Sequence, residues 1–268
     1  MSGSTEDLTG WLGRGIDIFG FDPFAGATNV KPTRILTATP PAGVIERLRL
    51  GTYGYDEIYA DSLVDITRKL TIEAGLKGSY SDFSGSISSK FGLSTQRTEK
   101  THFLKIIFNV GGHIYNITRD KEGLKLLLDE DFENALDKYD VDELFKAYGT
   151  HLIKKMLVGG RAEYFCQSSD TTSIKEIEFR TAAKLKYKNV GGSLQGTTDV
   201  GYVDNTKLKL VQGRETIDTI GGTGKAAVEL KTGRWAEWAE SCDANPAFLS
   251  FDKLDGLMPI WELCGRKS

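Results

Sequence analysis

The stretch Phe145-Lys-Ala-Tyr-Gly-Thr-His-Leu-Ile-Lys-Lys-Met-Leu-Val-Gly-Gly160 joins two unlike elements. The residues after Asp140 carry apolar side chains at helical spacing, and Asp140 is a candidate N-cap, so they predict a short helix that Gly149 ends. Residues 153–158 form an apolar run of strand length. Paired glycines such as Gly159-Gly160 add no packing to a strand and indicate a bend or a close approach of two backbones. An ordinary connection from helix to strand would also explain this stretch.

The order of residues in this stretch also has a known counterpart. Tyr148-Gly149-Thr150-His151, seven residues, and then Gly159-Gly160 resembles the signature of the membrane-attack-complex/perforin superfamily, the MACPF domain. Leu152 departs from the family pattern, which prefers an aromatic residue there. The opening Leu12-Gly-Arg-Gly-Ile-Asp17 is similar to the opening of the family, with Ile16 in place of an aromatic residue.

The end of the chain supports the same resemblance. Residues 214–222 are similar to the closing strand of the family with its second glycine pair, Gly221-Gly222. Trp235-Ala-Glu-Trp238, then Asn245-Pro246, and the short apolar stretch 259–263 resemble the ending of the domain. Because these motifs occur in the order of the family and reach from one end of the chain to the other, the chain is identified as a member of this superfamily of pore-forming proteins.

Composition excludes several other classes. With 268 residues, 40% hydrophobic and 26% charged, the chain is globular. Its net charge of −3 and pI of about 5.8 argue against a nucleic-acid partner. No apolar run reaches the ~18 residues of a membrane-spanning helix, and no secretion signal is visible at the N-terminus. Cys166, Cys242 and Cys264 lie too far apart for a dense disulfide framework; Cys242 could pair with Cys264, or all three could be free thiols.

The sequence gives no sign of an enzyme. His102, His113 and His151 lie in unrelated contexts, without the spacing of a zinc site, and neither a phosphate-binding loop nor a nucleophile elbow is present. We therefore predict no catalytic, cofactor-binding or metal-binding residue. Thr150 and His151 are expected to satisfy backbone groups where the helix meets the bent strand.

Residues 70–93 alternate between apolar and polar side chains with a period of two. The pattern changes register at Ser81-Asp82, as a hairpin turn would produce, and each arm is close to the ~9–11 residues of a tilted membrane strand. Its large apolar residues are Leu70, Ile72, Leu76, Tyr80, Phe83, Ile87, Phe91 and Leu93. A soluble hairpin with one face on the core fits the same alternation, and so does a stretch that folds as short helices.

A second alternating region lies within residues 175–210, with turn residues at 189–193. Its large apolar residues are Ile177, Phe179, Leu185, Tyr187, Leu194, Val200 and Tyr202. The opposite face of the first arm carries a basic stripe. Such a stripe is usually a solvated face, but in a pore it would line the lumen or attract anionic headgroups.

The resemblance implies an α+β fold, with a bent and twisted four-stranded antiparallel sheet flanked by two helix clusters. These clusters would be the prospective transmembrane hairpins, 70–94 and 175–210, stored as helices. After insertion, the large apolar residues named above for each segment would face the membrane. Tyr148, Gly149, Thr150 and His151 would be signature residues, and Gly159, Gly160, Gly221 and Gly222 would form the hinge where the sheet opens. A lone hairpin in hydrocarbon leaves edge backbone groups unpaired, at several kcal/mol each, so insertion requires a closed barrel shared by neighbouring subunits.

We therefore expect a secreted, soluble monomer that assembles as a homo-oligomeric ring on a lipid membrane and inserts two amphipathic hairpins per subunit into a shared β-barrel. The alternative is a non-lytic MACPF module in signalling, adhesion or immune regulation; the absence of charge on the two apolar faces favours insertion. Residues 1–265 are expected to form a single domain with no separate targeting domain. Two situations would account for the lack of a targeting domain: the chain is a domain excised from a longer protein, or a companion protein brings it to the membrane.

Overall fold

The computed structural model describes residues 8–19, 29–51, 53–76, 89–91, 101–168, 174–191, 208–209, 211–213, 217–229 and 235–264. The strands are β1 (Arg14–Ile16), β2 (Val30–Arg34), β3 (Ile45–Arg49), β4 (Tyr53–Ala60), β5 (Phe103–Ile117), β6 (His151–Ile153), β7 (Lys155–Ser168), β8 (Val211–Gly213), β9 (Asp218–Ile220), β10 (Ala247–Phe251) and β11 (Leu257–Pro259). The helices are α2 (Leu63–Glu73), α4 (Lys121–Lys125), α5 (Glu130–Lys138), α6 (Val141–Tyr148), α7 (Glu176–Gly191), α9 (Gly224–Glu229), α10 (Trp235–Ala244) and the 3-10 helix η3 (Ile260–Glu262).

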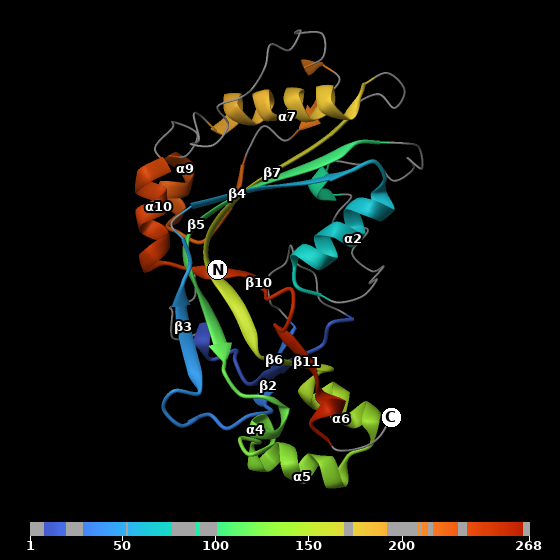
Figure 1. The fold of residues 1–268 in the computed structure, drawn as a ribbon, viewed down its shortest axis with the longest axis vertical. Helices are drawn as coiled ribbons and strands as arrows, with labels where there is room; N and C mark the ends of the chain where they lie inside the picture. Colours follow the sequence, from blue (N-terminus) through green and yellow to red (C-terminus); the bar gives the residue numbers. More distant parts are fainter. Residues whose placement is uncertain are drawn as a thin grey trace.

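The larger sheet is antiparallel and, in the described part of the chain, four strand positions wide (Figure 1). The long strands β5 and β7 pair along most of their length and form its centre. Along the outer edge of β5, β4 and β3 follow one another. Along the outer edge of β7, the short strands β8, β9 and β10 do the same. These strands together make the four-stranded antiparallel arrangement that the resemblance implies.

The sheet bends where β5 and β7 carry glycine pairs. The register between the two strands shifts between Val110 and His113. A Cβ on Gly112 (φ 114°) would lie 2.5 Å from the carbonyl oxygen of Val158, and a Cβ on Gly159 would lie 2.9 Å from the Cα of Gly112. Only residues without a Cβ allow the two backbones to lie this close. The close backbone approach expected at the glycine pair of β7 is therefore present.

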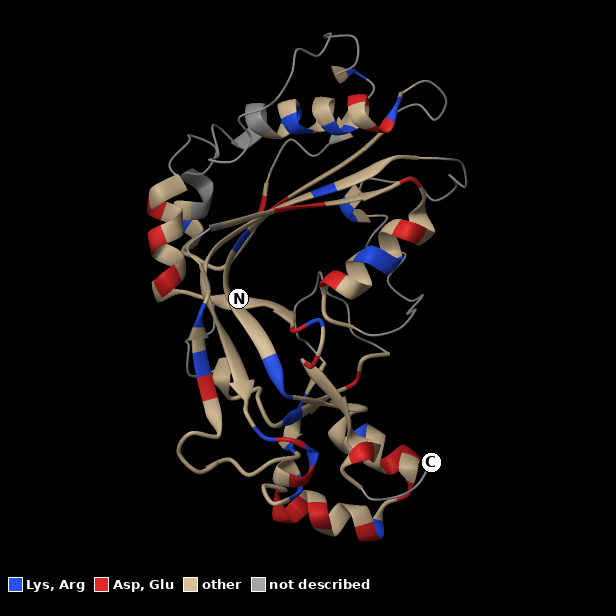
Figure 2. Ribbon diagram, in the orientation of Figure 1, with Lys and Arg blue, Asp and Glu red and all other residues tan. Residues whose placement is uncertain are grey.

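A smaller four-stranded sheet, in the order β11-β6-β1-β2, lies below the larger one in the view of Figure 1. Helix α6 leads into it and begins as predicted at Asp140, whose side chain accepts a hydrogen bond from the Glu143 N–H (2.8 Å). The Glu143 carboxylate accepts one from the Asp140 N–H in return (3.2 Å), which completes a capping box. Gly149 ends the helix with a φ of 78°. Helices α4, α5 and α6 carry many acidic residues at this end of the molecule (Figure 2).

The two faces of the larger sheet belong to separate hydrophobic cores. On one face, here the α7 face, even-numbered residues of β5, and of β7 beyond Gly160, pack with α7 and α10; Leu104 and Tyr164 are examples. On the other, the α2 face, odd-numbered residues such as Phe103 and Phe165 pack in the same core as α2. Helices α2 and α7 thus cover opposite faces of the same half of the sheet (Figure 1).

Most described residues of the two alternating segments are helical, and none of them is in a strand. Residues 70–73 form the last turn of α2, residues 89–91 are helical, and α7 takes up 176–191. The interpretation of their alternation as an ordinary soluble hairpin is therefore wrong for these residues, and they show the helical form implied by the resemblance. The physical reason is that apolar residues spaced by four satisfy a helical and a strand period at once.

Candidate functional site

Helix α2 is bounded by local signals and buried through a regular stripe. Ser62 is its N-cap, with the side chain accepting a hydrogen bond from a backbone N–H of the first turn (3.2 Å). Gly75, with a φ of 81°, follows its end. Between them Ile66, Leu70 and Ala74 recur every four residues and are buried. This spacing places them on one side of the helix.

The helical register of α2 conflicts with the alternation of its sequence. Thr71 and Glu73, which belong to the polar face of the alternating pattern, are buried. Ile72, which falls on its apolar side, is 50% exposed. Burying a carboxylate and exposing branched apolar side chains both cost free energy. The sequence of α2 therefore also fits a second, extended conformation, in which these residues exchange environments.

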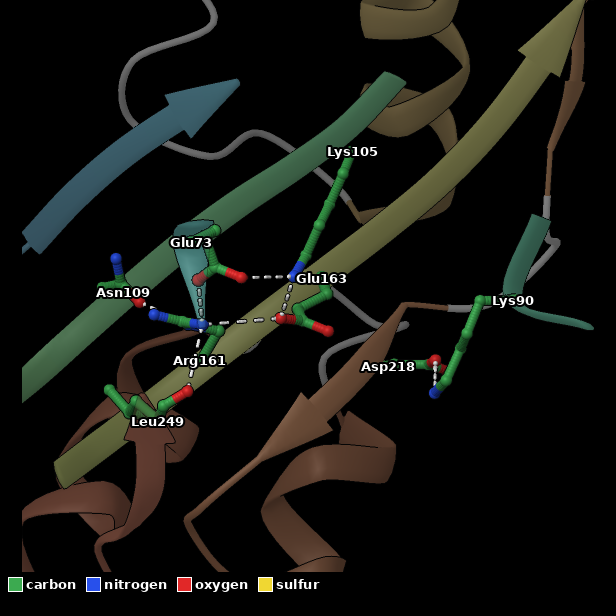
Figure 3. Close-up of polar contacts among 8 residues, drawn as sticks. All are labelled: Glu73, Lys90, Lys105, Asn109, Arg161, Glu163, Asp218 and Leu249. Atoms are coloured by element: carbon green, nitrogen blue, oxygen red, sulfur yellow. Dashed lines mark hydrogen bonds and ion pairs between the residues drawn. The ribbon is translucent and has the colours of Figure 1, made fainter. Parts of the chain in front are cut away.

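The carboxylate of Glu73 lies in a buried ion cluster between α2 and the sheet (Figure 3). Its Oε2 is 3.2 Å from Lys105 Nζ of β5, and its Oε1 is 2.5 Å from the Arg161 guanidinium of β7. Lys105 also pairs with Glu163 at 2.7 Å. Two cations and two carboxylates thus neutralise one another in the interior, as buried charges require.

The protonation state of Glu73 follows from these neighbours. Burial alone raises the pKa of its carboxyl, but the charges of Lys105 and Arg161 outweigh burial and hold the pKa below its ordinary value. A second ion pair on the same face joins Lys90 of the 89–91 turn to Asp218 of β9, at 2.8 Å (Figure 3). Together these contacts tie the first alternating segment to β5, β7 and β9.

Helix α7 shows the same double spacing as α2. Phe179, Ala183 and Tyr187 recur every four residues, and all are buried on the α7 face. Ile177, on the apolar side of the alternating pattern, is 79% exposed. The buried hydroxyl of Tyr187 has no hydrogen-bond partner in the described part of the chain, at a cost of about 1–3 kcal/mol. The helical form of α7, like that of α2, therefore has a cost: it leaves one apolar side chain in water and one buried hydroxyl without a hydrogen bond.

Ion pairs also hold α7 to the sheet, through Glu57 of β4. Its carboxylate lies 2.6 Å from Lys184 Nζ and 3.0 Å from the Arg180 guanidinium, and it accepts a hydrogen bond from the Tyr55 hydroxyl (2.6 Å). Burial raises the pKa of Glu57, but these three donors outweigh burial and hold the pKa below its ordinary value. Arg180 also pairs with Glu176 one turn earlier, at 3.2 Å.

The glycines predicted as hinge residues lie together at the bend, beneath α10: Gly159, Gly160, Gly221 and Gly222. A Cβ on Gly221 would lie 2.4 Å from the carbonyl oxygen of Gly159, and one on Gly160 would lie 2.2 Å from Cys242 Sγ. The Trp238 indole N–H donates to the Gly221 carbonyl oxygen (3.2 Å). Helix α10 therefore rests directly on the glycine pairs. Cys242 is a free thiol, so its pairing with Cys264 is excluded.

The signature residues lie in the smaller sheet, apart from the bend. The Thr150 hydroxyl accepts a hydrogen bond from the Ile18 N–H and donates one to the Ile16 carbonyl oxygen, both at 3.3 Å. It thus satisfies backbone groups, as predicted. His151 instead contacts the Thr150 hydroxyl (3.0 Å) and packs edge-on against Trp261. Burial lowers the pKa of His151 to about 4, so the ring is neutral at pH 7.

The residues predicted to face the membrane fall into three groups. Leu70, Leu76, Phe91, Phe179 and Tyr187 are buried, Leu185 is half-buried, and Ile72 and Ile177 are exposed. Tyr80, Phe83, Ile87, Leu93, Leu194, Val200 and Tyr202 lie outside the described residues. Their orientation toward a membrane stays a prediction.

Sequence analysis missed the charged residues that hold the two helices. Lys105, Arg161 and Glu163 interrupt strands that are otherwise apolar, and a charge inside a buried strand needs a partner. Glu57 stands between two tyrosines of the same strand face and gives a similar signal. Within the described ranges no group of three His, Cys, Asp or Glu residues is placed to hold a metal, and none of the helices has the length and hydropathy to cross a bilayer.

Comparisons with known proteins agree with this architecture. The family model of the MAC/Perforin domain, MACPF, matches residues 9–260. No curated protein matches the sequence significantly. The fold is similar to that of GNIP1Aa from Chromobacterium piscinae, with a TM-score of 0.71 and 20% identity, over 97% of this chain and 53% of that one. A MAC/Perforin-domain protein from Bacteroides thetaiotaomicron gives a TM-score of 0.65 and 17% identity, over 98% and 57%. The chain thus spans little more than half the length of these two structures.

Proposed function

Because the chain belongs to the MAC/Perforin family, we propose that it is a pore-forming protein whose segments 70–94 and 175–210 change from helices to membrane strands. No catalytic step is part of this proposal. The protein is released as a soluble monomer, binds a lipid membrane, and assembles there as a ring of identical subunits. A companion protein that brings it to the membrane is compatible with this route.

One observation carries the proposal: in α2 and α7 some residues have the opposite exposure to the one that the alternation of their sequence requires. Ile72 and Ile177 are apolar and exposed, while Glu73 is charged and buried. In a hairpin with one face in hydrocarbon and the other in water, the two apolar side chains would enter the lipid and Glu73 the water. Conflicts between local pattern and fold are expected where a segment has a second structure to adopt.

The body of the protein has the parts that such a change needs. The helices are bound to opposite faces of the sheet, so each can leave without disturbing the other. The glycine pairs Gly159-Gly160 and Gly221-Gly222 leave the bend without side chains, and α10 covers them. We propose that the bend opens there when α10 moves. Edge strands of one inserted subunit remain unpaired until neighbours close the barrel, so insertion and ring formation are coupled.

Dye release from liposomes tests this proposal when each segment can be locked reversibly. One variant, in a chain with Cys166, Cys242 and Cys264 replaced by alanine, carries Lys90→Cys and Asp218→Cys, joined by a short bifunctional thiol reagent with a reducible spacer. Lys90 Nζ lies 2.8 Å from Asp218 Oδ2, so a reagent about as long as the two side chains that it replaces can join the cysteines. We expect leakage to stop on crosslinking and to return after reduction.

A second variant carries Arg180→Cys and Glu57→Cys and locks α7 in the same way. The matched control carries a single cysteine of each pair and receives the same reagent, and we expect it to leak before and after treatment. Leakage that continues at the same rate with both crosslinks intact would exclude the helix-to-hairpin mechanism. Absence of leakage from the unmodified protein, despite membrane binding, would favour the non-lytic alternative.

A further inference from the structure

Residue parity connects the faces of the sheet to the faces of the prospective hairpins, because side chains alternate along an uninterrupted strand. In β4, Ile58 packs on the α2 face and Tyr59 on the α7 face, so even positions of β4 belong to the α2 face. The apolar positions of the first arm, such as Leu70 and Ile72, are also even. If this arm extended β4, its apolar side chains would emerge on the α2 face.

The two long central strands give the same result. In β5, odd-numbered Phe103 packs on the α2 face, and the apolar positions of 83–93, the arm that precedes it, are odd. In β7, odd-numbered Phe165 packs on the α2 face, and the apolar positions of 177–187, the arm that follows it, are odd. If both arms extended these strands, their apolar sides would continue the α2 face.

The fourth arm agrees as well. In β8, Val211 packs on the α7 face, so even positions belong to the α2 face, and the apolar positions of 194–202 are even. Each arm could have fallen on either side of the sheet, since a shift of one residue exchanges the faces. The agreement of all four means that the membrane side of the hairpins continues the α2 face, and that their polar side continues the α7 face.

Resting on the proposed function, we propose that the α7 face becomes the inner wall of the channel, and that Glu57 places a ring of carboxylates there that favours the passage of cations. Glu57 lies on the α7 face beneath α7, where Lys184 and Arg180 now neutralise it. Its neighbour Asp56 lies on the opposite face of β4 by the same parity. One subunit thus contributes one carboxylate to the ring.

The cations that neutralise Glu57 in the monomer cannot remain beside it in the pore. Across the sheet, Glu57 of β4 pairs with Ile106 of β5, and Ile106 pairs with Tyr164 of β7, so Tyr164 lies at the same level as Glu57. Arg180 follows Tyr164 by 16 residues, since 180 − 164 = 16. At ~3.3 Å per residue an extended chain carries it about 50 Å away. The Glu57 carboxylates therefore face the lumen without their present partners, at a level distant from the basic residues of the second hairpin.

The reversal potential of single pores in a planar bilayer under a KCl gradient tests this assignment. Glu57→Lys reverses one charge per subunit on the proposed inner wall, and Asp56→Lys makes the same change on the outer wall. At ~0.05 M salt, where screening is weak, we expect Glu57→Lys to lower the cation-to-anion permeability ratio by about twofold or more. Asp56→Lys is expected to leave the ratio at its original value.

Two further measurements cover a failure of Glu57→Lys to fold. Glu57→Gln keeps the size of the side chain and its contact with Tyr55, and it should shift the ratio in the same direction by a smaller amount. Single cysteines at positions 57 and 56, in a chain without the native cysteines, can be modified by a bulky charged thiol reagent after pores have formed. We expect a reduced conductance at position 57 and an unchanged conductance at position 56.

The outcomes separate this inference from the proposed function. Pores in which Asp56→Lys shifts the ratio and Glu57→Lys does not would overturn the assignment, because the α2 face would then line the channel. Pores indifferent to both changes would overturn it as well. A complete lack of conductance in the unmodified protein would instead contradict the proposed function, and with it the inner wall.

Discussion

The two prospective membrane segments are held to opposite faces of one sheet by ion pairs that differ in their access to water. Around Glu73 of α2, the Lys105 and Arg161 side chains are 3% and 6% exposed. Around Glu57, which holds α7, the Lys184 and Arg180 side chains are 29% and 39% exposed. A buried pair is costly to break because an uncompensated charge remains in the interior, whereas water and salt screen a half-exposed one. We therefore expect α7 to be released more readily than α2.

Removing the charge of Glu73 should give the largest effect. We expect Glu73→Gln to lower the free energy of unfolding by about 3 kcal/mol, near the lower end of the range for a broken buried pair, because Glu163 still faces both cations. Urea denaturation of the soluble monomer measures this. As a control, Glu73→Gln with Lys105→Met should cost less than the sum of the two single changes. A loss below ~1 kcal/mol for Glu73→Gln would remove the basis of the comparison.

The same change at Glu57 should have a smaller and more local effect. Glu57→Gln is expected to cost about 1 kcal/mol, because its cationic partners are partly solvated. Hydrogen exchange should quicken in α7 and stay unchanged in α2. Glu176→Gln, which removes only the other partner of Arg180, is the matched control and should cost roughly 0.3–0.5 kcal/mol. Equal losses at positions 57 and 73 would show that burial does not distinguish the two sets of ion pairs.

The response to salt concentration should distinguish α7 from α2 without any substitution. Raising the ionic strength from about 0.05 M to about 0.5 M shortens the screening length severalfold, which weakens the Glu57 pairs and barely affects those of Glu73. We expect amide exchange in α7 to rise with salt by a few-fold, while exchange in α2 stays constant. The opposite order of sensitivity would reverse the expected order of release.

Acid should act on partly buried histidines before it acts on the ion pairs of the two helices. His151 is neutral in the folded protein down to a pKa of about 4, whereas an unfolded histidine takes up a proton near pH 6.5. Stability is therefore lost as pH falls from about 6.5 to about 4, and His151→Gln should reduce that slope in denaturation experiments. His113, whose pKa is also lowered by burial and by Arg47, contributes the remainder. The carboxyl groups of Glu57 and Glu73 have lowered pKa values, so their contributions are present above about pH 4.3 and are lost at lower pH. A slope between pH 6.5 and 5 that is as steep in His151→Gln as in the original protein would contradict this division.

Short-range signals were readable in the sequence. Asp140 predicted the start of α6, Gly149 its end, and the glycine pair at 159–160 the close approach of two backbones; each depends on the residues beside it. The order of the family motifs gave the fold class. The charged residues that hold the helices were not recognised, because Glu73 meets its partners across 32 and 88 residues of chain. A charge in a strand shows that a partner is needed, and only the packing of distant segments shows which one.

The sequence by itself determined that 70–93 and 177–202 have one apolar and one polar side as strands, since that follows from a period of two. It could not determine that residues 70–73, 89–91 and 176–191 are helical in the folded protein. Leu70 with Ala74, and Phe179 with Ala183, are spaced by four residues and suit both conformations. The sheet decided between them: it offers each helix an apolar face and a charged partner, and both are contacts that only the tertiary structure creates.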